Sequence, residues 1–173
     1  MRVAALLRGI NIGSRKRIAM PALREIVESL GHTDVETYLQ SGNVVFTPAT
    51  DEDLATQLED AIEAATGHEV SVVVRTADEL RAVVDRNPYQ VDDATKVVVA
   101  FLGEAVELGD LSLGDLGSYL PDELTLAGRE LYVSVPNGQG RSKLMEALTK
   151  RRLPTTLTVR NWRTVTALAE LTR

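Results

Sequence analysis

Hydrophobic residues in the first 75 positions show two spacings in turn. One is every second residue, which is typical of strands, and the other is every third or fourth residue, which is typical of helices. Residues 2–8 place apolar side chains at every second position, which predicts a strand with Val3, Ala5 and Leu7 on one face. Pro21 then opens a segment with apolar residues three and four apart, which predicts a helix. The same two patterns recur and predict further strands at 35–39, 43–47 and 70–74, and a helix that begins in the acidic segment 50–53.

The order strand, helix, strand, strand, helix, strand is that of a ferredoxin-like fold, in which two helices cover one face of an antiparallel sheet. We predict an α+β protein of two tandem ferredoxin-like (β-α-β-β-α-β) lobes with antiparallel sheets and a C-terminal helix. The predicted lobes are residues 1–75 and 95–173, and residues 76–94 form a connecting helix and linker. In the second lobe the expected elements are strands at 96–102, 123–126, 130–135 and 155–159, and helices at 110–119, 142–151 and from Trp162 onward.

The composition narrows the class of protein. The chain has 173 residues, 44% of them hydrophobic, and no cysteine. Disulfides, thiolate nucleophiles and Cys-ligated metals are therefore excluded. The longest apolar run, 97–102, has the length of a strand and falls far short of the ~20 residues that span a bilayer. We expect a soluble, cytoplasmic protein without a membrane partner, a cofactor or a metal ion.

The net charge of −6 is distributed unevenly along the chain. Residues 1–20 carry five basic and no acidic side chains, and residues 128–173 carry nine basic and three acidic ones. The segment 21–127 carries 22 acidic and five basic side chains. Acidity therefore belongs to the middle of the chain, and its two basic ends are compatible with an anionic partner.

Each of the two histidines follows a glycine that is predicted to end a helix. His32 comes after Gly31 and His68 after Gly67. Neither has a second histidine or a glutamate at the spacing of a metal site. We therefore interpret both as histidines at the negative end of a helix dipole rather than as catalytic groups or ligands.

Three loops are richer in Gly, Asn and basic residues than a simple turn requires, and each precedes a predicted helix. They are residues 8–17, 136–143 and 160–164. Glycines and helix starts present backbone N–H groups to an anion, and basic side chains supply charge. The turn 40–43 adds neutral polar groups if it lies near the first loop. The candidate ligand-binding residues are Arg8, Asn11, Arg15, Lys16, Gln40, Ser41, Asn43, Asn137, Arg141, Ser142, Lys143, Arg160 and Asn161.

Four separated motifs resemble a known bacterial family. They are the segments 6–13, 38–46, 137–144 and 160–165, which begin with Leu-Leu-Arg-Gly, Tyr-Leu-Gln-Ser, Asn-Gly-Gln-Gly and Arg-Asn-Trp-Arg. Together they are similar to the family called Domain of Unknown Function 1697, and the similarity spans essentially the whole chain. The resemblance implies a ferredoxin-like double lobe and no established activity.

Three hypotheses of function remain open at this point. The first is a binding module for a phosphate-containing or other anionic ligand, including a nucleotide or nucleic acid. The second is an enzyme that acts on a phosphorylated small molecule, in which Ser14, Ser41 or Ser142 serves as nucleophile or donor. Its weakness is that no acidic side chain lies within the candidate loops to act as a base. The third is a structural or interaction protein, monomeric or homodimeric, without a ligand.

Overall fold

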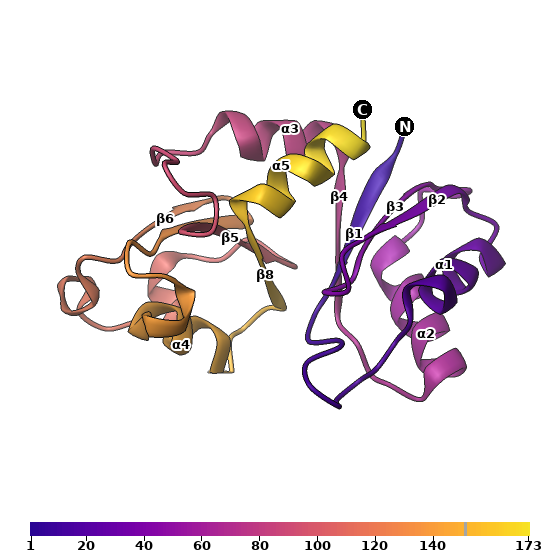
Figure 1. Cartoon of the computed structure of the whole chain (residues 1–173), viewed down its shortest axis with the longest axis horizontal. Coiled ribbons are helices and arrows are strands. Elements are labelled where there is room, and N and C mark those ends of the chain that lie inside the picture. The colour runs from indigo at the N-terminus through magenta and orange to yellow at the C-terminus, as the bar shows by residue number, and fades with distance from the viewer. Residues whose placement is uncertain (151) are drawn as a thin grey trace. The chain divides into compact units, whose positions relative to one another are not determined.

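The first half of the chain forms alternating strands and helices. The computed structural model describes residues 1–150 and 152–173. Within residues 1–85 its elements are, in chain order, β1 (Val3–Leu7), α1 (Met20–Ser29), β2 (Thr33–Tyr38), β3 (Asn43–Thr47), α2 (Leu54–Thr66), β4 (Val72–Thr76) and α3 (Ala77–Asp85) (Figure 1).

The second half contains four more strands and two more α-helices. Its strands are β5 (Val97–Leu102), β6 (Glu123–Ala127), β7 (Glu130–Ser134) and β8 (Leu157–Asn161). Its α-helices are α4 (Lys143–Lys150) and α5 (Trp162–Leu171), and its 3₁₀ turns are η1 (Leu108–Leu111), η2 (Leu116–Tyr119) and η3 (Gln139–Arg141). None of the helices in the described residues is long and apolar enough to cross a membrane.

The predicted α+β class and the antiparallel sheets are confirmed. The first sheet has the strand order β2-β3-β1-β4 and the second the order β6-β7-β5-β8. All neighbouring strands pair antiparallel, so that Ala5 of β1 lies opposite Val44 and Val74, and Ala100 of β5 lies opposite Leu131 and Val159. Each sheet therefore has at its centre the strand that comes first in its half of the chain.

The chain divides into two compact units. Unit 1 comprises Met1–Ala82 and Leu168–Arg173, and unit 2 comprises Val83–Ala167. The divisions fall within α3 and within α5. Unit 1 thus contains the first sheet, and unit 2 contains the second.

The core of unit 1 lies between the sheet and two helices. Helices α1 and α2 lie side by side on one face of the sheet (Figure 1). They contribute buried Leu23, Val27 and Ile62 to a cluster that includes Val3 and Leu7 of β1. Asp53 accepts the amide hydrogen of Thr56 and so caps α2, as its place in the acidic segment 50–53 predicts.

The core of unit 2 is built on one helix and the η1 segment. Leu144 and Leu148 of α4 pack with Ala100 of β5, Leu131 of β7 and Leu111 of η1. The apolar face of α4 has the three- and four-residue spacing that predicts a helix here. Helix α4 thereby holds its N-terminus, where the candidate residues Ser142 and Lys143 lie, at the edge of this core.

The central strands are buried on both faces. In β1, Ala4 and Leu6 point away from the α1/α2 core yet are fully buried, and in β5 the same holds for Val99. The final strand of each sheet adds a buried arginine on this second face, Arg75 opposite Ala4 and Arg160 opposite Val99. The second face of each central strand is therefore buried as well.

Some local predictions are wrong or displaced, and one lies outside the described residues. Leu39 lies in the turn after β2 with a φ of 59° and is exposed, because the strand ends at Tyr38. Residues 110–119 form parts of two 3₁₀ turns and no α-helix, because Gly114 and Gly117 interrupt the segment. The strand predicted at 155–159 lies at Leu157–Asn161. The predicted end of the preceding helix, Arg151, lies outside the described residues.

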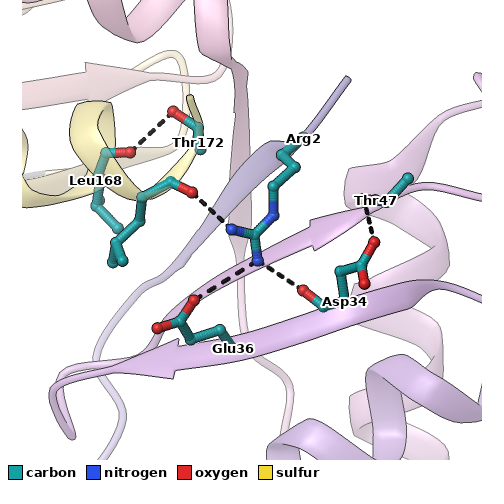
Figure 2. A network of polar contacts seen from close by, with 7 residues as sticks. Arg2, Asp34, Glu36, Thr47, Leu168 and Thr172 are labelled. Atoms are coloured by element: carbon teal, nitrogen blue, oxygen red, sulfur yellow. Dashed lines mark hydrogen bonds and ion pairs between the residues drawn. The ribbon is translucent and has the colours of Figure 1, made fainter.

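Arg2 links the first strand to the end of the last helix. One guanidinium nitrogen donates to the carbonyl of Leu171 and another to the carbonyl of Asp34, both at 2.7 Å (Figure 2). The Glu36 carboxylate lies 3.7 Å away, and the Asp34 carboxylate accepts a hydrogen bond from Thr47. A cation that bonds the last carbonyls of a helix also stabilises the negative end of the helix dipole.

We predict that Arg2→Met lowers the free energy of unfolding by about 2 kcal/mol, because it removes charge-assisted hydrogen bonds to two backbone carbonyls. Arg24→Met is the matched control, since Arg24 is exposed and pairs only with Glu28 one turn away; its expected effect is within about 0.5 kcal/mol. Urea unfolding of both variants is the measurement. Equal losses in the two variants would contradict a stabilising role for Arg2.

Candidate functional site

The second candidate loop opens into a polar cavity of unit 2. Asn137, Arg141 and Lys143 line a cavity of about 200 Å³ together with Asp122 and residues 118–121. Arg141 and Lys143 stand on either side of the point where η3 ends and α4 begins, and both side chains are exposed. The cavity therefore presents two cations, an amide and one carboxylate at the start of a helix.

Ser142 is buried and holds two parts of this cavity together. Its hydroxyl donates to Oδ2 of Asp122 at 2.7 Å and accepts the amide hydrogen of Met145 at 2.9 Å. The second bond makes Ser142 the N-cap of α4. The first ties the residue before β6 to the start of α4, so the predicted ligand-binding hydroxyl acts within the protein.

A larger cavity shares Tyr119, Leu120 and Asp122 with the first. It has a volume of about 400 Å³, and its remaining walls come from Tyr89, Leu144, residues 116–117 and residues 123–125. The hydroxyl of Tyr89 lies 2.8 Å from that of Thr125. Burial raises the pKa of Tyr89, the Thr125 hydrogen bond lowers it, and the nearby Glu123 carboxylate raises it, so the phenol stays protonated at neutral pH.

The first candidate loop, in unit 1, is fastened by Asn11. The side-chain amide of Asn11 donates to the carbonyls of Ile18 and Gln40, at 3.0 and 2.8 Å, and accepts the amide hydrogen of Ile18. The loop and the β2–β3 turn are therefore adjacent, as the first-loop hypothesis requires. The amide of Asn11 is committed to these backbone bonds.

Among the cavities described here, the basic residues of the first loop contribute Arg17 alone to a lining. Arg8, Arg15 and Lys16 are exposed, and the Lys16 ammonium donates to the carbonyl of Glu69. A cavity of about 490 Å³ lies beside the loop, lined by Asn11, Gln40 and residues 17–21 at the start of α1. The one cation in this lining is Arg17, whose guanidinium donates to the carbonyl of Gly13.

The β2–β3 turn lies tightly against the first loop. Gly42 has a φ of 93°, and a Cβ built there would lie 2.7 Å from Ile10 and 2.9 Å from Leu7, so glycine is required. Asn43 is fully buried and donates to the carbonyl of Tyr38 and to the hydroxyl of Ser41. Gln40 and Ser41 are exposed.

The third candidate loop is part of a strand and a helix cap. Arg160 lies on β8, is buried, and donates to Thr158 and to the carbonyl of Val159; burial lowers its pKa to about 10. Asn161 accepts the amide hydrogen of Thr164 and caps α5. Trp162, the first residue of α5, is half-buried.

Five of the thirteen predicted ligand-binding residues line cavities, and they fall into two groups. Asn137, Arg141 and Lys143 line one cavity of unit 2, and Asn11 and Gln40 line one cavity of unit 1. Within the described residues, no group of three His, Asp or Glu side chains is placed to hold a metal ion.

Sequence reasoning missed the residues that complete the unit 2 cavities. Asp122, Tyr89 and Tyr119 lie outside all three loops, and nothing in their local sequence distinguishes them from turn residues. Asp122 is the acidic side chain that the loops themselves lack. The one signal in the sequence is that the loops contain no carboxylate, so a carboxylate would have to come from elsewhere in the chain. Only the fold selects Asp122 among the 25 Asp and Glu residues.

His32 is a buried, neutral histidine, and the expected interaction with a helix dipole does not describe it. Its Nδ1 accepts the amide hydrogen of Ala49 at 3.0 Å, and its ring stacks on Phe46 with 4.7 Å between ring centroids. A helix C-terminus would favour the charged form, whereas burial lowers the pKa of His32. It is therefore a core residue of unit 1.

A protein-family model matches most of the chain. The family model described as a protein of unknown function, DUF1697, matches residues 1–132. The chain belongs to the DUF1697 family. The match includes the first loop, the β2–β3 turn and Asp122 of this DUF1697 protein, and ends before the turn that carries Arg141 and Lys143.

A solved structure resembles the whole DUF1697 protein. It is that of a conserved bacterial protein from Streptococcus pneumoniae, with 21% sequence identity and a TM-score of 0.79, and the likeness covers 99% of this chain and 98% of that chain. At this identity the likeness shows the fold alone. No curated protein matches the sequence.

We predict that the stability of this DUF1697 protein falls between pH 7.5 and 5.5 because of His32. Its pKa in the folded state is lower than the ordinary value of about 6.5, so the unfolded chain binds more protons as the pH falls. Urea unfolding at the two pH values is the measurement. His68→Gln should keep this loss, and His32→Gln should reduce it; an unchanged pH dependence in His32→Gln would refute the assignment.

Proposed function

We propose that the protein binds a small phosphate-containing ligand in the unit 2 cavity lined by Asn137, Arg141 and Lys143. The observation that supports this is the pair of exposed cations on either side of the start of α4, facing the same cavity. Guanidinium and ammonium groups form charge-assisted hydrogen bonds with phosphate oxygens, and a helix start favours negative charge. The amide of Asn137 adds a neutral donor.

The small volume of the site and its two cations favour a small ligand over a nucleic acid. Two cations at one cavity of about 200 Å³ match a single phosphate group, whereas a nucleic-acid surface neutralises a run of backbone phosphates. The unit 1 cavity is the weaker candidate, because its lining has one cation, Arg17, already bonded to a backbone carbonyl.

An enzyme that acts on a phosphorylated small molecule is the second candidate. The observation that favours it is the 2.7 Å hydrogen bond from the Ser142 hydroxyl to Asp122, which pairs a hydroxyl with a possible base beside the two cations. Against it, both side chains are buried and the same hydroxyl caps α4. Release of inorganic phosphate from ribose 5-phosphate, abolished in Ser142→Ala and retained in Ser142→Thr, would favour the enzyme; binding alone predicts that the compound is recovered unchanged.

The strand orders of the two sheets support the prediction of two tandem ferredoxin-like lobes. In each sheet the strand that is first in sequence lies between the third and the fourth, and the second lies at the edge beside the third. This is the order expected of tandem ferredoxin-like lobes with two-strand hairpins.

A cytoplasmic location is proposed on the absence of cysteine from the chain.

We predict that ribose 5-phosphate binds the protein and that Arg141→Ala or Lys143→Ala weakens this binding about tenfold or more, the value of one charge-assisted hydrogen bond. Isothermal titration calorimetry at low and moderate salt is the measurement. Arg81→Ala, which removes an exposed cation paired with Asp78 on α3, should leave the affinity unchanged.

A fourth variant, Arg17→Ala, tests the location of the site. The proposal requires the affinity of Arg17→Ala to equal that of the unmodified protein. Weakening by Arg17→Ala and not by Arg141→Ala would place the ligand in the unit 1 cavity. Absence of binding at low salt would overturn the proposed function altogether.

A further inference from the structure

The space beside the phosphate site is large enough for the rest of a ligand. The cavity of about 400 Å³ and the cation-lined cavity share Tyr119, Leu120 and Asp122 as walls, so the two meet at these residues. Sites for small organic ligands have volumes of about 300–1,000 Å³. A ligand whose phosphate lies at Arg141 and Lys143 therefore has room to extend past Asp122 into the larger cavity.

The larger cavity has walls suited to a flat ring. Two of the four tyrosines in a chain with only seven aromatic residues, Tyr89 and Tyr119, line it. The hydroxyl of Tyr119 donates to the carbonyl of Leu113, which fixes its ring in place. Leu116 and Leu120 border the cavity with exposed fractions of 37% and 65%, which is large for leucine side chains. A ring inserted here would bury apolar surface that is now open to water.

Asp122 lies at the junction of the two cavities and offers a hydrogen-bond acceptor there. Its side chain belongs to a residue that is only 8% exposed. Ser142 donates to Oδ2, and no described residue donates to Oδ1. An ionised carboxylate can only accept hydrogen bonds, and neighbouring sugar hydroxyls are donors that match it.

The outer wall of the larger cavity also presents acceptors. Glu123 and Thr125 are two residues apart on β6, on the exposed face of the strand, and Tyr89 lies close to both. The exposed carboxylate of Glu123 accepts hydrogen bonds from exocyclic amino groups, in the way that Glu and Asp recognise the amino group of cytosine. A ring carbonyl at the same position would instead face the carboxylate with its own negative partial charge.

These four features lie in one order, from cations through a carboxylate to aromatic walls with a second carboxylate. We infer that the unit 2 cavities form a nucleoside monophosphate site: the phosphate lies at Arg141 and Lys143, the ribose hydroxyls at Asp122, and the base beside Tyr89 and Tyr119, with Glu123 selecting bases that carry an amino group. This inference rests on the proposed function and names the ligand class of the same site.

The experiment compares nucleotides that differ at one edge of the base. AMP and IMP form one pair, and CMP and UMP the other, because each pair differs by an amino group against a carbonyl, and the adjacent ring nitrogen changes from an acceptor to an N–H donor. Ribose 5-phosphate and adenosine are titrated beside them by calorimetry on the full chain. We expect AMP to bind about tenfold more tightly than IMP, and CMP than UMP, the ratio of one added hydrogen bond to a charged group.

Three variants assign this preference to residues. Glu123→Gln should bring the affinities within each pair close together, because an amide offers both a donor and an acceptor, and should leave ribose 5-phosphate binding unchanged. Glu104→Gln, the same change at an exposed glutamate of unit 2 that lines neither cavity, should preserve the preference. Arg141→Ala should weaken the binding of all the phosphorylated compounds.

The outcomes separate this inference from the proposed function. If ribose 5-phosphate binds as tightly as every nucleotide, the phosphate site stands and the nucleotide inference is overturned. If nucleotides bind without an amino preference, or the preference persists in Glu123→Gln, the assignment of the base is overturned. If no phosphorylated compound binds, or adenosine binds as tightly as AMP and Arg141→Ala changes neither, both proposals are overturned.

Discussion

Burial of the central strands on both faces is the constraint on which the rest of the structure depends. Every side chain of β1 and of β5 is buried, although the strands belong to antiparallel sheets that often leave one face to water. A polar group placed within these strands would lose its hydration. Polar chemistry is therefore confined to the ends of these central strands, to the edge strand β6 and to the loops, which is where the two cavities described in unit 2 lie.

The two buried arginines show how the fold departs from this constraint in a regular way. Arg75 and Arg160 occupy the fourth position of β4 and of β8, and each is followed by a helix cap, Thr76 or Asn161. Both donate to the carbonyl of the residue before them in the strand. This equivalence between the halves extends over only a few residues, Val-Arg-Thr and Val-Arg-Asn. It also means that Arg160 contributes to the basic end of the chain while serving the interior of the protein.

Sequence patterns predicted the elements whose determinants are local and missed those determined by distant contacts. The third strand, 43–47, and the helix start in the acidic segment 50–53 follow from residues at most four apart, and the structure confirms them. The segment 108–119 carries apolar residues at helical spacing, but its glycines favour 3₁₀ turns. The pairing of Asp122 with Ser142 spans 20 residues and two elements, so no local pattern specifies it.

The acidic net charge of the protein is compatible with an anion site because the relevant field is local. Charges that are exposed and separated by more than about 8–10 Å are screened at physiological salt, so the 22 acidic residues of the middle segment act mainly on their own surroundings. At the unit 2 cavity the balance is two cations against Asp122. In the proposed site, that carboxylate would repel a bare phosphate ion and would accept hydrogen bonds from hydroxyl donors on the same molecule. Selection among anions would then depend on what is attached to the phosphate, because a carboxylate beside two cations favours ligands that carry donors as well as negative charge.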